Sequence, residues 1–334
     1  MIEFEAVTKV FGSIRAVDQV SFQVRRGELC VLIGPSGCGK TTTLRMVNRL
    51  VEPTAGRVLV RGVDVMRLDP VHLRREIGYV IQQVGLFPHM TVEENITVVL
   101  RLLEWDARRR RARAEELLEL VGLPPDFLSR YPRQLSGGQQ QRVGVARALA
   151  ADPDIILMDE PFGAVDPIIR RQLQLELKRI QAAVRKTILF VTHDLSEAFL
   201  LGDHIVVMNE GRIVQDGTPQ DLLLRPANEF VARFIAESRA LGILRVRKVS
   251  EVMDPALTKP SVADCKFWVR SEDSLFDAIR RLGSQLAGVL CGLEERTVAV
   301  LDESGSVVGC TTFEELVRAV SEAFATSGVP EVIL

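Results

Sequence analysis

The sequence predicts an α/β fold: a mainly parallel sheet, an antiparallel β subdomain, a helical subdomain and a small α+β domain near the C-terminus. Over the first 235 residues, short apolar runs that end on polar residues alternate with helical patterns, as buried strands do in such folds. One of these runs, residues 29–33, is followed by a glycine-rich loop and a helix start. The length of 334 residues exceeds one average domain, so we expect two.

The composition excludes several classes of protein. Lys+Arg 42 against Asp+Glu 44 gives a net charge of −2, which argues against a protein that coats nucleic acid. The five cysteines form no C-x-x-C pair, which suits a reducing compartment without structural disulfides or a zinc site. The N-terminus lacks a signal-peptide pattern, and no stretch approaches about 18 uninterrupted apolar residues. We therefore expect a cytosolic chain. Docking of this chain on a membrane-bound partner is compatible with these observations.

The N-terminal strands lead to a predicted phosphate site. Residues 2–23 alternate apolar and polar side chains around a turn, so they predict short antiparallel strands. The buried strand that follows leads into Gly34-Pro35-Ser36-Gly37-Cys38-Gly39-Lys40-Thr41, with a helix start at Thr42. In a G-x-x-x-x-G-K-T loop the backbone N–H groups point at phosphate oxygens, the lysine reaches the β- and γ-phosphates, and the threonine hydroxyl binds Mg²⁺. We therefore expect phosphates at residues 34–42.

Two residues near this loop carry further predictions. Phe11 lies at the turn in the N-terminal strands. An aromatic residue beside a glycine turn ordinarily packs in a core, but the expected nucleotide site also makes Phe11 a candidate to stack on adenine. Cys38 lies inside the loop rather than in a core, so we expect alkylation of its thiol to interfere with phosphate binding.

The next strand, residues 77–82, ends on Gln82. Because ligand groups in open α/β sheets gather beyond the carboxyl ends of strands, this amide is a candidate to reach a metal or an attacking water. A loop-facing glutamine is the alternative. Residues 84–90 are apolar and broken by a proline where a solvated loop should be polar, which suggests a surface for a partner.

Helical patterns then continue to about residue 151. Thr91, followed by Glu94, predicts a capping box at a helix start. The basic run 108–113 is followed closely by glutamates, so we interpret it as a solvated helix face rather than a nucleic-acid site. Further on, Ser136-Gly137-Gly138-Gln139 opens a helix with a good N-cap and glycines that let a phosphate approach the backbone. We expect a second anion site there, although an ordinary helix start is the alternative.

Two carboxylates, Asp159 and Glu160, end a buried parallel-strand pattern. Asp159 is placed to hold Mg²⁺ through its water shell, and Glu160 to orient or deprotonate the water that attacks the γ-phosphate. A later strand, residues 187–192, ends on His193. A lone histidine is more often structural, but its place at the edge that carries Glu160 favours contact with the γ-phosphate.

Together these motifs resemble those of the ATP-binding subunits of ABC transporters, over roughly residues 1–235. They occur in the family's order and approximate spacing: loop 34–41, Gln82, 135–139, 155–160 and His193. The resemblance implies ATP and Mg²⁺ as ligands. It also implies a homodimer in which residues 136–139 of one copy close on the ATP held by the other. One departure is the loop Gly163-Ala164-Val165-Asp166, where the family more often has Ser-Ala-Leu-Asp, although Asp166 is in place.

Within the family, residues 81–91 are similar to the corresponding stretch of bacterial importers of quaternary amines such as glycine betaine, choline and carnitine. After an expected linker, 236–248, residues 249–322 resemble a CBS module, with a tail over 323–334. In this module we expect strand, turn and strand over 298–309 and a helix over 312–320. Only one module fits, so a second would come from the dimer mate. We interpret Thr312 and Glu315 as a capping box rather than a ribose site.

The resemblance implies an ATPase on the cytoplasmic face of the inner membrane that binds permease subunits and works indirectly with a substrate-binding protein, without nucleic acid. It implies Glu160, His193 and Gln82 as catalytic residues, and Thr41, Gln82 and Asp159 at the metal. One alternative is an importer of another small solute, such as an amino acid, sugar or polyamine. The other is a soluble ABC ATPase acting on ribosomes or DNA. That class typically carries tandem cassettes or a long coiled-coil insertion, and this chain has neither.

Overall fold

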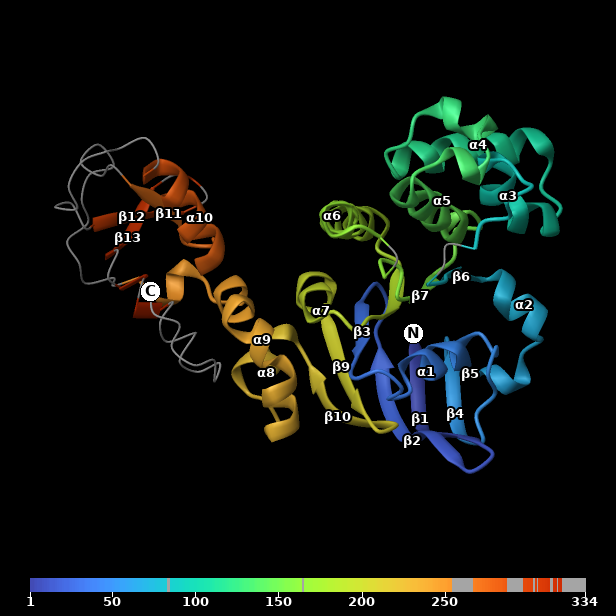
Figure 1. The fold of residues 1–334 in the computed structure, drawn as a ribbon, viewed down its shortest axis with the longest axis horizontal. Coiled ribbons are helices and arrows are strands. Elements are labelled where there is room, and N and C mark those ends of the chain that lie inside the picture. The colour runs from blue at the N-terminus through green and yellow to red at the C-terminus, as the bar shows by residue number, and fades with distance from the viewer. Residues whose placement is uncertain are drawn as a thin grey trace. The chain divides into compact units, whose positions relative to one another are not determined.

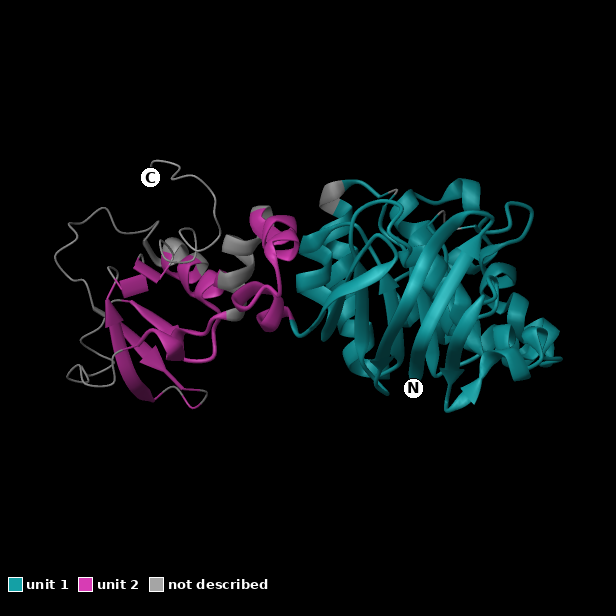
Figure 2. Ribbon diagram, turned by 90° about the horizontal axis from the view of Figure 1, so that it is seen from below, with its two compact units in different colours: residues 1–218 teal, residues 219–334 magenta. Residues whose placement is uncertain are grey.

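The computed structural model describes residues 1–82, 85–163, 165–253, 267–286, 297–302, 304, 306–312, 315, 316, 318 and 319. The chain divides into two compact units, residues 1–218 and 219–334 (Figure 2). The ATPase part that we expect from the sequence, residues 1–235, extends beyond the first of these units. Residues 219–235 hold α8 (Pro219–Leu224) and the start of α9 (Glu229–Val246), which contact each other. Such a contact between helices is not visible in local sequence patterns. None of the described helices combines the length and apolar character needed to cross a bilayer.

A six-stranded sheet forms the centre of the first unit (Figure 1). Its order is β10-β9-β3-β8-β7-β6, and only β10 runs antiparallel to its neighbour. The strands are β3 (Leu29–Ile33), β6 (Ile77–Val80), β7 (Ile155–Asp159), β8 (Thr187–Val191), β9 (His204–Asn209) and β10 (Arg212–Gly217). Every residue of β3, β7 and β8 is buried. The predicted parallel sheet is confirmed, and the carboxyl ends of β3, β6, β7 and β8 share one edge.

A second, four-stranded antiparallel sheet has the order β2-β1-β4-β5. Its strands are β1 (Ile2–Phe11), β2 (Ile14–Val24), β4 (Ala55–Val60) and β5 (Val63–Asp64). Helix α1 (Lys40–Val47) contacts strands of both sheets, so the core that joins them is built around this helix. Buried residues of α1, such as Leu44 and Met46, pack there with side chains from β1, β3 and β7.

The helical subdomain follows β6 in the chain, and its last helix, α5, contacts this edge strand of the six-stranded sheet (Figure 1). It consists of α3 (Val92–Leu102), α4 (Ala107–Leu120), the 3-10 turns Pro125–Ser129 and Pro132–Gln134, and α5 (Gly137–Leu149). The capping box predicted at Thr91 is confirmed, since its hydroxyl accepts from Glu94 N at 3.2 Å and Thr91 N donates to the Glu94 carboxylate at 2.7 Å. In the basic run, Arg111 pairs with Glu115 and Arg113 with Glu116, which fits a solvated helix face.

The remaining helices of the first unit flank the sheets. These are a 3-10 turn (Val65–Arg67), α2 (Pro70–Arg75), α6 (Pro167–Val184) and α7 (Leu195–Leu201). Helix α7 packs on β3, and α6 packs on α7. Figure 1 shows α6 and α7 on one side of the six-stranded sheet and α1 on the other. The edge formed by the carboxyl ends of β3, β6, β7 and β8 therefore lies between helices on both faces of the sheet.

In the second unit, β11 (Trp268–Arg270) pairs parallel with β12 (Thr297–Leu301), and β12 pairs antiparallel with β13 (Val307–Thr312). A 3-10 turn (Val249–Glu251) and α10 (Leu275–Leu286) complete its described elements. The expected strand, turn and strand over 298–309 are present. Thr312 and Glu315 form the predicted capping box, with hydrogen bonds of 2.8 and 3.1 Å. Residues 236–246 of the expected linker lie within α9, and the expected tail, 323–334, lies outside the described residues.

Candidate functional site

The glycine-rich loop, residues 34–39, joins β3 to α1 with a backbone that only glycine fits at two positions. A Cβ on Gly34 would lie 2.0 Å from Met208 O, and one on Gly39 would lie 2.4 Å from Ala16 O. Gly39 is also the N-cap of α1 with a φ of 102°, and no side chain caps that helix. The N–H groups of the first turn, which includes Thr41 and Thr42, therefore face the loop as potential donors to an anion.

Lys40 is held inside this loop. Its side chain is buried, and Nζ donates to Gly34 O at 2.8 Å and to Pro35 O at 2.9 Å. These bonds hold the ammonium against the backbone of the loop. In a strand–loop–helix unit with this glycine and lysine spacing, phosphates are expected to bind at the same loop. The carbonyls of Gly34 and Pro35 fix the ammonium without neutralising it, so its charge stays available to an anionic ligand.

Cys38 differs from its predicted environment. The side chain is 4% exposed and belongs to the core between the two sheets, with Sγ 3.7 Å from Lys40 Nζ. The expectation that this residue lies outside a core is wrong, because the loop turns the thiol inward, beneath its own backbone. The thiol is therefore shielded from solvent, so its alkylation should be slow while the protein is folded.

Asp159 ends β7 beside the first turn of α1. Thr41 Oγ1 donates to Asp159 Oδ1 at 2.8 Å, and Arg45 Nη2 lies 3.3 Å from Asp159 Oδ2. Tyr79 OH lies 3.5 Å from the same Oδ2. Burial raises the pKa of Tyr79, and the hydrogen bond with Tyr79 raises the pKa of Arg45. The carboxylate is thus fixed from one side by a guanidinium and a phenol.

Arg45 and Tyr79 are not among the site residues that the sequence predicts. Their signals are weak, because an arginine one turn into a helix and a tyrosine within a strand are both common. The periodicity of α1 does place Arg45 one turn after Thr41, on the same face, and that spacing was the available clue. The oxygen donors of Thr41, Asp159 and Gln82 are the chemistry that Mg²⁺ prefers, with phosphate and water oxygens completing its shell.

Glu160 contacts the other two predicted catalytic residues, Gln82 and His193. Its Oε2 accepts from Gln82 Nε2 at 2.9 Å and lies 3.2 Å from His193 Nδ1. Gln82 is therefore not simply loop-facing. His193 is not a core histidine either, since its side chain is 57% exposed. Glu160 has a φ of 45°, a left-handed conformation, and its N–H donates to Val191 O at 2.9 Å. A non-glycine residue in this conformation is strained, and such residues concentrate at functional sites.

The residues of the second predicted anion site open α5. Ser136 Oγ accepts from Gln139 N at 3.3 Å, and Gln139 Oε1 accepts from Ser136 N at 2.9 Å, which completes a capping box. A Cβ on Gly137 would meet nothing within 4 Å, so this backbone is open to approach, whereas Gly138 lies against Ile169 of α6. These hydrogen bonds join the segment to itself rather than to the loop that holds Lys40.

The last two predicted ligand contacts are peripheral. Phe11 is 48% exposed, with Lys9 Nζ 4.8 Å from its ring centroid, so its ring is open to stacking and is not a core residue. Asp166 is exposed just before α6, and its carbonyl accepts from Arg170 N at 2.8 Å. Neither position conflicts with a role at a nucleotide.

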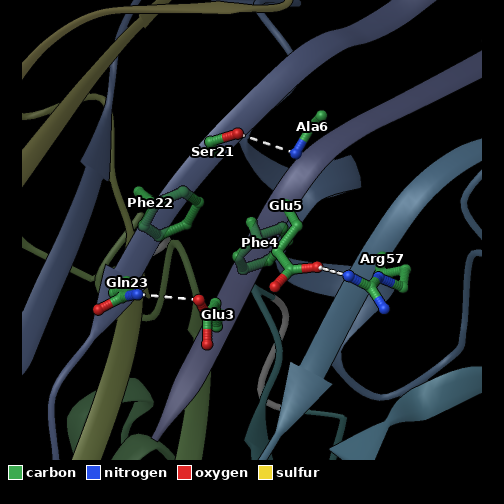
Figure 3. A pocket seen from close by; sticks show the side chains of 8 residues that line it. All are labelled: Glu3, Phe4, Glu5, Ala6, Ser21, Phe22, Gln23 and Arg57. Atoms are coloured by element: carbon green, nitrogen blue, oxygen red, sulfur yellow. Dashed lines mark hydrogen bonds and ion pairs between the residues drawn. The ribbon is translucent and has the colours of Figure 1, made fainter. Parts of the chain in front are cut away.

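A separate hollow of about 630 Å³ lies on the antiparallel sheet (Figure 3). It is lined by Glu3, Phe4, Glu5, Ala6, Ser21, Phe22, Gln23 and Arg57. Its polar groups satisfy one another: Gln23 bonds Glu3, Arg57 pairs with Glu5, and Ser21 accepts from Ala6 N. Each polar side chain of the hollow therefore already has a partner among the lining residues, and none of the predicted site residues lines it.

Known proteins similar to this chain are ATP-binding proteins of transporters, as expected from the phosphate loop and the residues at the strand ends. A family model described as ABC transporter matches residues 17–163. The chain is 56% identical over 242 residues to the glycine betaine/carnitine/choline transport ATP-binding protein OpuCA of Bacillus subtilis, covering 72% of this chain and 64% of that protein. It is 48% identical over 315 residues to the osmoprotectant import ATP-binding protein OsmV of Salmonella typhimurium, covering 92% of this chain and 78% of that protein.

A solved structure of the ATP-binding cassette MJ0796 has the same fold in the first unit. It is a dimer in a post-hydrolysis state bound to ADP and Pi, and the TM-score is 0.59 with 35% identity, over 65% of this chain and 98% of that one. The match with OsmV spans nearly the whole chain, including the second unit. By identity, coverage and the geometry of the loop and strand ends, the chain belongs to the ATP-binding proteins of ABC transporters, which hydrolyse ATP.

Proposed function

We propose that this chain is the ATP-hydrolysing subunit of a membrane importer for quaternary-amine osmoprotectants such as glycine betaine, choline and carnitine. The observation that carries the ATPase part is the convergence of Gln82 and His193 on Glu160, at the strand edge beside the phosphate loop. The substrate class is supported by the relatives, whose names include glycine betaine, carnitine, choline and osmoprotectant transport.

The residues of this site divide the work of hydrolysis. The loop amides and Lys40 bind the phosphates, while Thr41 and Asp159 would hold Mg²⁺, which neutralises charge on the β- and γ-phosphate oxygens. Glu160 orients the attacking water and accepts its proton. Gln82 and His193, both within hydrogen-bond distance of Glu160 Oε2, keep that carboxylate turned toward the phosphate side.

The proposed active unit is a homodimer. Residues 136–139 form a capped, open helix start in the helical subdomain, and their hydrogen bonds do not involve the phosphate loop. A second copy would bring this helix N-terminus to the γ-phosphate, where its amides and dipole favour negative charge. Phe11 would stack on adenine, and Asp166 would lie near the dimer contact. The dimeric MJ0796 cassette supports this arrangement.

The surface proposed for the permease is the loop 85–91 with the groove beside it. Phe87 is 40% exposed at this loop, and the groove of about 270 Å³ next to it is lined by α2, β6, α3 and α5. The loop is rigidly built. The fully buried Asn95 accepts from Phe87 N at 2.7 Å and donates to Phe87 O and Met90 O, both at 3.1 Å. Arg147 Nη1 also donates to Gly85 O at 2.8 Å.

An apolar side chain presented on a fixed loop suits an occupant that is itself ordered and apolar, such as a short helix of a membrane subunit. This loop follows Gln82 in the chain, and Gln82 donates a hydrogen bond to Glu160. Movement of the occupant would therefore change the position of Gln82 relative to Glu160. The protein would then lie on the cytoplasmic face of the inner membrane, bound through this surface, with the substrate-binding protein acting across the bilayer.

For the second unit we propose a CBS-like regulatory module over residues 249–322, with 1–235 as the ATPase part. The parallel β11–β12 pair and the β12–β13 hairpin support this assignment. A second module from the dimer mate would complete the pair. In the capping box at Thr312, the Glu315 carboxylate accepts a hydrogen bond from Thr312 N. The carboxylate is therefore already engaged and is not suited to binding a ribose.

The deciding experiment is reconstitution. The full-length chain is co-purified with its permease, placed in vesicles with the associated binding protein, and assayed for ATP hydrolysis and uptake. Glycine betaine, choline or carnitine should stimulate both, while proline, maltose and spermidine should not. Stimulation only by one of the latter would identify an importer of another solute. Failure to bind any permease, with stimulation by ribosomes or DNA, would identify a soluble ATPase.

A further inference from the structure

A buried carboxylate lies behind the turn that carries His193. Glu197, on α7, is 3% exposed. Its two oxygens are held by neutral donors: Thr192 Oγ1 donates to Oε2 at 2.6 Å, and Gln174 Nε2 donates to Oε1 at 3.0 Å. Burial raises the pKa of Glu197, and the hydrogen bonds from Thr192 and Gln174 act in the opposite direction. Burying a carboxylate among neutral donors is costly, so this network calls for a reason.

Thr192 connects this carboxylate to the backbone on both sides of His193. Its N–H donates to Leu32 O at 3.2 Å, which ties the residue to the end of β3. Its hydroxyl donates to Glu197 and accepts from Asp194 N at 3.0 Å. The turn 192–194 is thereby fixed by one hydroxyl whose own direction is set by Glu197.

His193 itself depends on that turn. Its side chain is mostly exposed, and its Nδ1 lies 3.2 Å from Glu160 Oε2. Little packing holds the ring, so the direction of the side chain follows from the backbone of residues 192–194. A shift of this turn by about 1 Å would break the contact with Glu160.

The same network reaches α6. Gln174 is 4% exposed on that helix, and Arg170, one turn earlier, has Nη1 3.8 Å from Asp194 Oδ2. Arg170 Nη2 also donates to Val165 O at 3.1 Å, and Arg170 N donates to Asp166 O. The turn of His193 and the loop that ends at Asp166 are thus both tied to the first half of α6.

We infer that Glu197 is a positioning residue for hydrolysis: through Thr192 it aims His193 at Glu160, and through Gln174 it links that aim to α6 and the loop before it. The inference rests on the proposed roles of Glu160 and His193. It adds a buried residue whose two oxygens are held by Thr192 and Gln174, and it assigns the histidine's orientation to a carboxylate four residues further along the chain.

The first test replaces Glu197 with leucine in the full-length chain, which keeps the volume but removes both acceptors. We expect kcat for ATP to fall about tenfold or more, with KM for MgATP within about twofold, because positioning is lost while the phosphate loop is untouched. Leu201→Ala is the matched control, since Leu201 is a buried residue of the same helix outside the network. It should lower the melting temperature without changing kcat of the folded protein.

The second test exchanges the pair. In Glu197→Gln with Gln174→Glu, the amide oxygen at 197 still accepts from Thr192 and its NH₂ donates to the carboxylate at 174. Both hydrogen bonds are kept while the charge moves to α6. We expect this double variant to recover most of the kcat lost in Glu197→Leu. The kcat of Gln174→Leu alone should lie between that of Glu197→Leu and that of the double variant.

A third readout does not depend on turnover. The ring signals of the four histidines are followed by NMR in ¹³C-histidine-labelled protein, with His193 assigned by its loss in His193→Gln. Glu197→Leu should shift the His193 signal, as Glu160→Gln does, while Leu201→Ala should not. An unmoved His193 signal, or a kcat for Glu197→Leu equal to that of Leu201→Ala, would overturn the inference. Full turnover in His193→Gln and Glu160→Gln would instead overturn the proposed site.

Discussion

Replacing Glu160 with glutamine separates the chemistry of hydrolysis from the architecture of the site. Both hydrogen bonds in this cluster end on one oxygen, Oε2, which lies 2.9 Å from Gln82 Nε2 and 3.2 Å from His193 Nδ1. An amide oxygen in that position keeps both partners, and the NH₂ group takes the place of Oε1. The left-handed backbone at φ 45° is equally strained for both residues. The substitution should therefore leave the site in place.

The expected loss is chemical. The amide cannot accept a proton from the attacking water, and general-base catalysis contributes about 10²-fold or more, equivalent to about 2.7 kcal/mol of barrier. Because the phosphate loop and Lys40 are unchanged, ATP affinity should stay within about twofold of the original. ATP-bound dimers should accumulate, since closure needs binding but opening needs hydrolysis.

Turnover is measured by phosphate release under excess MgATP, and dimer formation by size-exclusion chromatography with light scattering. Glu76→Gln is the control, because Glu76 forms a surface ion pair with Arg61 outside the site and its loss should leave turnover unchanged. Near-normal turnover of Glu160→Gln would refute the reasoning. So would loss of ATP binding with an unchanged melting temperature, since that would place Glu160 in the binding of the nucleotide.

Four further outcomes are expected. Lys40→Ala should weaken ATP binding about tenfold or more, measured by calorimetry, because a charge-assisted contact to phosphate is lost. Asn95→Ala should leave basal ATPase activity intact but reduce stimulation by the permease and binding protein, because the loop that presents Phe87 loses three hydrogen bonds to one buried amide. The Arg212 guanidinium holds the pKa of Asp18 below its ordinary 3.8, so this pair stabilises the fold at neutral pH and the contribution is lost as pH falls through the acidic range. Asp18→Asn should therefore narrow the difference between urea midpoints at neutral pH and at about pH 3. A chain ending at Val246, the last residue of α9, should hydrolyse ATP within about twofold of full length, and uptake should lose its dependence on internal salt because the proposed regulatory module, residues 249–322, is removed.

The functional edge of the sheet was predictable because each motif stands at the end of an apolar run. In parallel strands these ends meet at one edge, so Gln82, Glu160 and His193 could be expected near one another from spacing alone. The capping boxes at Thr91 and Ser136 were predictable for a related reason, since a cap and its N3 partner are three residues apart in sequence.

What escaped prediction depends on contacts between residues far apart in the sequence. Tyr79 and Arg45 meet Asp159 from different elements, and Gln174 reaches Glu197 across two helices. No local period encodes these pairs. The inward turn of Cys38 escaped for another reason, because a glycine-rich loop carries no period that assigns a face to its side chains.

The backbone at Glu160 explains how two consecutive carboxylates reach different partners at the end of one strand. Successive side chains of a strand point to opposite faces, so an extended residue after Asp159 would send its carboxylate away from the partners of Asp159. Asp159 contacts Thr41 and Arg45 of α1, whereas Glu160 contacts residues that follow β6 and β8. The left-handed turn at Glu160, held by its N–H on Val191 O, ends the strand and swings the second carboxylate along the sheet edge. The strain thereby supports the proposed function: it places the proposed metal-binding group, Asp159, and the proposed water-activating group, Glu160, side by side, each with its own set of partners.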